Sequence, residues 1–124
     1  MGKLVDLNSL DAGLTDIKTL GNQMVLCSAQ PTTYAEANAT FKLGSTALIA
    51  ADMVLANGDV SGRKLTVVAK AGIAVATAGT GNHVAIIDTV NARLKLVTTC
   101  PAQAVSSGGT FDIATWKYEQ QQPT

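Results

Sequence analysis

The feature that most constrains the fold is a series of short segments, from about Lys64 to Lys117, in which apolar and polar residues alternate. Gly, Asn, Asp and Ser separate these segments, and such residues are typical of tight turns. Alternation with a period of two places every second side chain on one face of a strand, so each segment is expected to be a half-buried strand. Several short strands with little helix between them predict a mainly β domain, a small antiparallel β-sandwich or barrel that is jelly-roll-like.

The strands of this second half are expected at residues 64–70, 73–77, 83–88, 93–98 and 110–118, with a loop at 78–82 and turns at 57–59 and 106–109. Earlier in the chain, an apolar run predicts a strand at 23–28, and Thr32 or Thr33 could cap a helical turn at 32–38. The pattern between Thr40 and Leu55 is ambiguous. Residues 40–43 suit a strand, and residues 47–55 suit one or two strands.

An N-terminal helix is predicted from Asn8 to Leu20, because Leu10, Leu14 and Ile17 recur at helical spacing and line one face. Asn8 or Ser9 can cap its start, and Gly21 can end it. The apolar stripe is narrow, so the helix must lie either on its own sheet or on a neighbouring subunit. Leu10, Leu14 and Ile17 are therefore candidate interface residues.

Length and composition predict one domain with a helical arm at 1–22, a β domain at 23–118 and a flexible C-terminal tail at 119–124. Hydrophobic residues make up 47% of the chain and aromatic residues only 4%, so the core is expected to consist of small aliphatic side chains. Neither a signal-peptide core nor an apolar run of about 20 residues stands out, which indicates a soluble product made in a cytoplasm. The net charge of zero disfavours binding to nucleic acid or to a membrane surface, and it favours self-association or docking on a larger assembly.

The residues with the most reactive side chains do not combine into a recognisable catalytic or metal-binding pattern. His83 would need Asp88 or Asp112 as an orienting carboxylate, and we interpret it instead as a histidine at the edge of a strand. Gly79 and Gly81 are interpreted as part of a hairpin loop, because they lead into a strand. Cys27 and Cys100 are interpreted as reduced and buried, and each precedes an Ala-Gln pair that could mark two strands ending at one edge. No enzyme activity, cofactor, metal or small-molecule substrate is predicted.

Two further groups of residues are candidates for contacts with other proteins. Arg63, Lys64 and Lys70 form a small basic group, interpreted as a solvated strand face or as a contact to an acidic protein surface. Trp116 and Tyr118 share one face of the last predicted strand, where they either close the core or anchor an interface. We include Arg63, Trp116 and Tyr118 among the candidate interface residues.

Several stretches of the chain resemble small proteins of tailed bacteriophages that belong to the virion structure. The stretches are Met24–Tyr34, Asn57–Lys64, His83–Ala85 leading into Asp88–Thr89, and Leu96–Cys100. The resemblance implies a capsid decoration or cement protein, present on the capsid surface after synthesis in the host bacterial cytoplasm. It implies the major capsid protein as partner and self-association as a dimer or trimer, and it assigns no role to any individual residue.

Two other functions remain open, a tail or head–tail connector protein and a carbohydrate-binding adhesion module. If the chain is a cement, the helix at 8–20 and the tail after Tyr118 are expected to act as clamps. Deleting residues 1–21 is then expected to abolish particle binding and to leave the β domain folded.

Overall fold

The computed structural model describes residues 7–120, without the side chains of Leu7, Asn8 and Leu10. The structure is mainly β, with antiparallel sheets and one N-terminal α-helix in a small β-sandwich-like fold, and this confirms the predicted fold class. The helix is α1 (Leu7–Leu20), and two short helical turns are η1 (Glu36–Thr40) and η2 (Ala50–Asp52). The strands are β1 (Gln23–Cys27), β2 (Lys42–Ala47), β3 (Met53–Asn57), β4 (Arg63–Val67), β5 (Lys70–Ala74), β6 (Gly79–Asp88), β7 (Arg93–Val105), β8 (Thr110–Ile113) and β9 (Trp116–Gln120).

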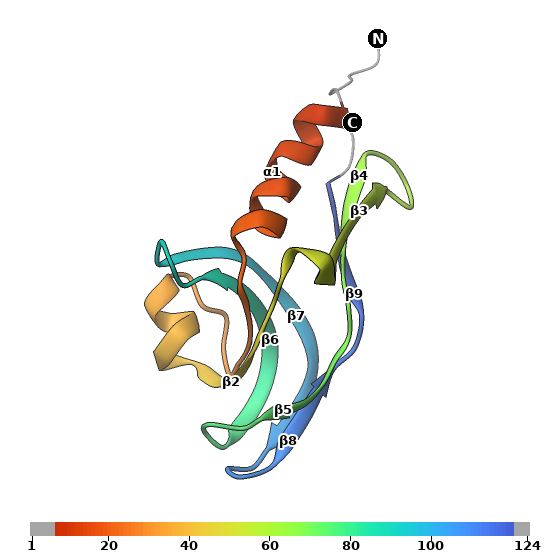
Figure 1. The fold of residues 1–124 in the computed structure, drawn as a ribbon. Coiled ribbons are helices and arrows are strands. Elements are labelled where there is room, and N and C mark those ends of the chain that lie inside the picture. The colour runs from red at the N-terminus through yellow and green to blue at the C-terminus, as the bar shows by residue number, and fades with distance from the viewer. Residues whose placement is uncertain (1–6, 121–124) are drawn as a thin grey trace.

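The strands form three antiparallel sheets that curve around one interior (Figure 1). A four-stranded sheet has the order β2-β1-β6-β7, a three-stranded sheet has the order β3-β4-β9, and β5 pairs with β8. Because β4 leads directly into β5, and β8 into β9, the two smaller sheets are successive parts of one bent ribbon. A bridge between Gly44 and Val75 joins this ribbon to β2 on one side.

Two apolar clusters follow from the period-two pattern of the four-stranded sheet. On β1, Met24 and Leu26 point into the main core between the sheets, whereas Val25 and Cys27 point to the opposite face. The helical turn η1 covers that opposite face and contributes Ala37 to the smaller cluster (Figure 1). The helical segment begins at Tyr34, ahead of η1, and the backbone N–H of Glu36 donates to Thr33 Oγ1 at 3.2 Å, so Thr33, one of the two expected caps, caps the start of this segment.

Helix α1 covers the upper end of the sheets and is attached to strands on both sides (Figure 1). Leu14 and Ile17 are buried in the main core, which shows that the helix packs on its own β domain. Polar contacts fix its orientation. Asp11 pairs with Arg63 of β4 at 2.7 Å, Asp16 pairs with Lys95 of β7 at 2.8 Å, and Lys18 Nζ donates to the carbonyl oxygens of Ala50 and Met53 at 2.5 Å each.

This arrangement corrects two sequence-based predictions about the helix. Leu14 and Ile17 are core residues of their own chain, so they are not an exposed surface for a partner, and the side chain of Leu10 lies outside the described part. A deletion of residues 1–21 would remove core side chains. It is therefore expected to destabilise the β domain, and the truncated chain is not a clean test of a clamp.

The strand bounds also differ from the predicted ones in the second half. Residues 79–81, predicted as loop, belong to β6, and β7 continues to Val105, where it pairs with Gly79. Gly81 is needed there for packing, because a Cβ on Gly81 would lie 2.5 Å from Leu26 Cγ. Cys27 ends β1, but Cys100 lies inside β7, so the two cysteines do not mark two strand ends.

Three other segments are settled by the structure. The ambiguous stretch contains β2, which ends at Ala47, and then β3 after the turn η2. The predicted strand at 110–118 is divided into β8 and β9, and β9 extends to Gln120, two residues into the predicted tail. Residues 121–124 lie outside the described part. None of the helices within residues 7–120 is long and apolar enough to cross a membrane.

Candidate functional site

A groove lies between β7 and the β8–β9 ribbon. β7 is the last strand of the four-stranded sheet and β9 is the last strand of the three-stranded sheet. The groove has a volume of about 380 Å³, within the range of about 300–1,000 Å³ that binding pockets occupy. We call it the β7–β9 groove, and its lining consists of Leu26, Val84, Thr98–Gln103 and Asp112–Lys117.

A bulge in β7 forms one wall of the groove. His83 pairs with Thr99 and Gly81 pairs with Gln103, so three residues of β7 lie opposite Asn82 alone. Pro101 is in the middle of this bulge and has no N–H to donate to a neighbouring strand. Bulges and prolines are devices that keep edge strands from pairing with other strands, and β7 is not paired with β9.

Trp116 forms part of the other wall. Its ring is half-buried against the main core, and its Nε1–H points to Met24 Sδ at 3.4 Å. Tyr118 follows on the same face of β9 and is 40% exposed. The buried side chains of Leu26 and Val84 form the floor. Trp116 therefore packs against the core and also borders the groove, and its role as an interface anchor stays a prediction.

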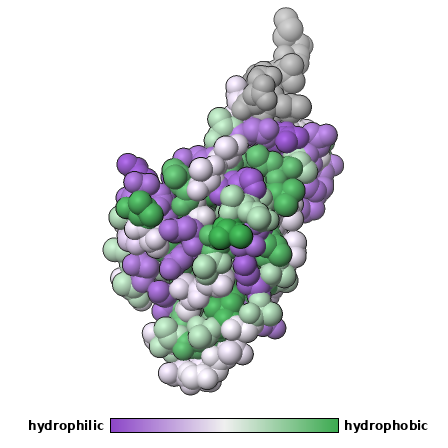
Figure 2. All heavy atoms as spheres, viewed as in Figure 1, coloured by the Kyte–Doolittle hydropathy of each residue, from purple (hydrophilic) through white to green (hydrophobic). Residues whose placement is uncertain are grey.

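The groove carries no net charge. Its charged lining residues are Asp112 and Lys117, and each has a partner. Asp112 accepts a hydrogen bond from the Gly72 N–H at 2.9 Å, and Lys117 pairs with Asp59. Residues 71–81 and 101–111 contain no Asp, Glu, Lys or Arg. Figure 2 shows the same contrast, with pale residues at the lower end of the molecule around β5 and β8 and strongly hydrophilic ones at the upper end.

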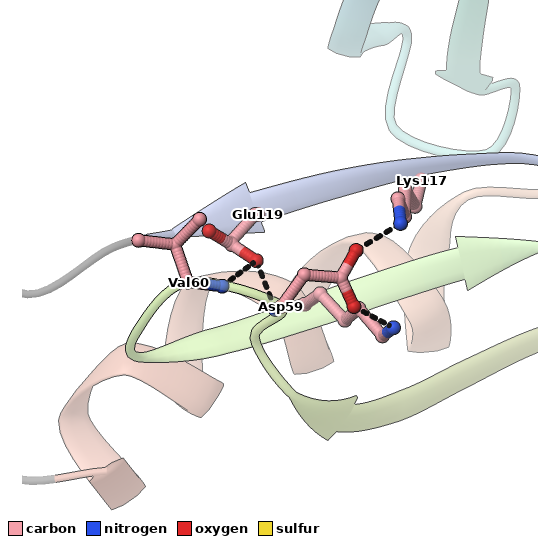
Figure 3. Close-up of polar contacts among 5 residues, drawn as sticks. Asp59, Val60, Lys117 and Glu119 are labelled. Atoms are coloured by element: carbon pink, nitrogen blue, oxygen red, sulfur yellow. Dashed lines mark hydrogen bonds and ion pairs between the residues drawn. The ribbon is translucent and has the colours of Figure 1, made fainter.

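The hairpin tip between β3 and β4 is fixed by charged side chains (Figure 3). Glu119 accepts hydrogen bonds from the backbone N–H groups of Asp59 and Val60. The Asp59 carboxylate pairs with Lys117 and, at 2.6 Å, with Lys64. Hydrogen bonds from Lys117 and then from Lys64 lower the pKa of Asp59 to about 2. The tip thus has a defined conformation and presents Val60 to solvent.

The three residues of the predicted basic group are all engaged within the chain. Arg63 pairs with Asp11, Lys64 pairs with Asp59, and Lys70 pairs with Asp52 at 2.9 Å. Arg63, predicted as an interface residue, serves to attach α1 to β4. Its half-buried ion pair leaves little free charge to present to a partner.

The structure does not assemble the arrangement considered for His83. The imidazole Nδ1 lies 2.6 Å from Asn82 Oδ1, its immediate neighbour. The Asp88 carboxylate accepts hydrogen bonds from Asn91 and from the Val90 N–H in the β6–β7 turn, and the Asn91 side-chain bond is the main reason that the pKa of Asp88 is lowered. Among residues 7–120, no group of three or more His, Cys, Asp or Glu side chains is arranged to hold a metal ion.

Both cysteines are free, but their surroundings differ. Cys27 is fully buried, and this burial, with a smaller effect of Cys100, raises the pKa of its thiol to about 11. Cys100 is half-buried in the lining of the β7–β9 groove, and partial burial raises its pKa. Sequence reasoning missed this position, because its place in the groove depends on the bulge in β7.

No protein-family model, no curated protein and no solved structure matches this chain.

Proposed function

We propose that this chain is a non-enzymatic structural protein of a tailed-phage virion, and that it decorates the capsid by binding the major capsid protein. The observation that supports this most is the β7–β9 groove, which is mostly apolar, without net charge and bordered by two strands at the ends of their sheets. Such a surface suits contacts with protein better than it suits a reaction. The stretches that resemble phage virion proteins support the same proposal.

The build of the molecule suits a cement. Ion pairs fix α1 and the β3–β4 tip, and a hydrogen bond from the Gly72 N–H to Asp112 links β5 to β8, so the domain loses little conformational freedom when it binds. On a capsid lattice, several weak contacts of identical copies act together as one strong attachment. A neutral and rigid domain can therefore bridge capsid subunits without any single strong site.

The experiment that tests this proposal counts copies of the chain in purified particles. Quantitative mass spectrometry is expected to find a ratio to the major capsid protein near one to one, or a simple fraction of it, as shell symmetry requires. A ratio of roughly a few per cent would instead assign the chain to the tail or the head–tail connector. Absence from the particles would rule out a virion role.

The carbohydrate-binding alternative is less well supported by the site. Trp116 is half-buried with its N–H directed to Met24, so its ring is not an open platform for a sugar. A glycan array on which the purified chain gives reproducible, saturable binding would reverse this ranking.

A further inference from the structure

An open and mostly polar hollow lies where α1, the segment before η1 and the start of β7 meet. Its lining consists of Asp16 and of residues 32–34 and 92–95, and we call it the α1–β7 hollow. The hollow has a volume of about 510 Å³, which is enough to admit a side chain of another protein. Two cations and one acid line it, namely Arg93, Lys95 and Asp16.

Arg93 is the lining residue whose charge is not used within the fold. It is exposed, and among the described residues it takes part in no hydrogen bond or ion pair. Lys95, by contrast, pairs with Asp16 at 2.8 Å. Of the other described Lys and Arg side chains, only Lys42 also lacks a partner, because the rest bind carboxylates or, for Lys18, carbonyl oxygens. Most cations of this chain therefore stabilise its own fold, and Arg93 is free to bind another molecule.

The other acids near Arg93 are occupied by donors of their own segments. Asp88 pairs in register with Arg93 across the β6–β7 hairpin, but it is 1% exposed, and its oxygens accept hydrogen bonds from the backbone and the side chain of Asn91. Glu36 accepts hydrogen bonds from the Thr32 N–H and hydroxyl, both at 2.8 Å. These contacts leave the Arg93 guanidinium without an acceptor among the described residues.

Hydroxyl groups add further donors to the lining of the hollow. Thr33 Oγ1 accepts from the Glu36 N–H, so its own hydrogen remains available. The Tyr34 side chain packs against the smaller apolar cluster, and no hydrogen bond among the described residues uses its hydroxyl. A guanidinium suits a carboxylate, because two parallel N–H groups match the two carboxylate oxygens. One unpaired cation fits one carboxylate better than it fits a nucleic acid, whose binding depends on several phosphate contacts.

We propose that the α1–β7 hollow receives an Asp or Glu side chain of a protein partner, with Arg93 as the paired cation. The inference rests on the proposed function, because it takes that partner to be the major capsid protein, and it names a contact distinct from the β7–β9 groove. β7 contributes residues to both sites, and Lys95 and Thr98 are separated by roughly 10 Å along a strand. One partner that lies along β7 can therefore contact both.

Carbodiimide cross-linking tests the contact directly, because it joins an amine to a carboxylate that already touches it. Arg93→Lys keeps the positive charge and supplies the amine. In particles that carry this variant, residue 93 is expected to become linked to an Asp or Glu of the major capsid protein, and mass spectrometry of the linked peptides identifies that acid. Lys42 is the control within the same chain, because it is also unpaired but lines neither the hollow nor the groove, and no link is expected there.

Binding to particles assembled without this chain gives a second readout. Arg93→Gln is expected to weaken binding about tenfold or more, whereas Lys42→Gln removes the same charge elsewhere and is expected to leave binding unchanged. The affinity of the wild-type chain should also fall more steeply with salt than that of Arg93→Gln. Because Arg93 has no partner among the described residues, Arg93→Gln should keep the wild-type urea midpoint, which separates an effect on binding from an effect on folding.

The possible failures are distinguishable. If the wild-type chain binds particles and Arg93→Gln binds equally well, or if both glutamine variants weaken binding alike, the inference is wrong and the proposed function stands. Absence of a link at residue 93 in bound particles has the same meaning. If the wild-type chain binds no particles, the proposed function fails and this inference fails with it. Binding of inorganic phosphate that calorimetry finds for wild type and not for Arg93→Gln, with capsid affinity unchanged, would assign the hollow to a phosphate instead.

Discussion

At the scale of single residues, Gly44 shows how closely two sheets approach each other, and Gly81 shows how closely β6 lies to Leu26 of the neighbouring strand β1. A Cβ on Gly44 would lie 2.6 Å from the carbonyl oxygen of Ala74 and 2.7 Å from Phe111 Cε1. Neither glycine has the positive φ that would require glycine for conformational reasons. Their small size is needed because other side chains and backbone fill the space.

We expect Gly44→Ala to lower the free energy of unfolding by about 1–3 kcal/mol, because the methyl group must displace the β5 backbone or Phe111. Urea denaturation measures this change. Gly13→Ala is the control, since its added Cβ has its nearest neighbour at 3.6 Å and a helical alanine is favoured over glycine by up to about 1 kcal/mol. Equal stability of the two variants would contradict the tight approach of β2 to β5.

Asp59 is the residue for which acid dependence is most clearly expected. The ordinary pKa of this carboxyl is 3.8, and pairing with Lys117 and Lys64 lowers it to about 2 in the folded chain. A lowered folded pKa means that the pairing stabilises the fold above the unfolded pKa, and that this contribution is lost as the pH falls from about 4 to 2. The contribution is small because the side chains are exposed.

The difference in urea midpoint between wild type and Asp59→Asn is therefore expected to be largest above pH of about 5 and to shrink toward pH 2. High salt should also reduce it, because exposed pairs are screened. A midpoint difference that stays constant from neutral pH to pH of about 2 would show that the loss does not come from the charge of Asp59.

At the scale of elements, α1 holds the two larger sheets together at the upper end of the fold. Its ion pairs reach β4 through Arg63 and β7 through Lys95, and Leu14 enters the core between them. Leu14→Ala is expected to cost about 2–5 kcal/mol of unfolding free energy, measured by urea denaturation, because it leaves a cavity among buried side chains.

Leu20→Ala in the same helix provides the comparison for Leu14→Ala. Leu20 is an exposed residue of the last turn, so its truncation is expected to cost about 0.5 kcal/mol or less. If both variants lost the same stability, the helix would be attached by its polar contacts alone. In that case, a loss of particle binding after deletion of residues 1–21 could be attributed to the loss of a clamp.

At the scale of the whole molecule, the unpaired edges are the feature with the greatest consequences. The bent ribbon is joined to β2 on one side by the bridge at Gly44, but β7 and β9 remain the ends of their sheets on the other. Under the proposed function, the groove between these two strands is the surface expected to contact the capsid.

The candidate site was only partly predictable. Trp116 and Tyr118 were placed together correctly on one face of a strand, because alternation along β9 shows which residues share a face. Leu14 and Ile17 were placed correctly on one face of a helix, but the sequence left open what that face covers. The place of Cys100 in the groove was not predictable, since it depends on residues distant in the chain.

The sequence by itself determined the fold class, the N-terminal helix, predicted at Asn8–Leu20 and observed at Leu7–Leu20, and the faces of most strands. Neighbouring residues encode those features through their spacing and their turn residues. Only the tertiary structure decided that Gly79–Gly81 is strand, that α1 covers its own domain, and that β7 and β9 stay apart. These outcomes depend on contacts between residues far apart in the chain, such as Gly81 with Leu26, and local periodicity carries no information about such contacts.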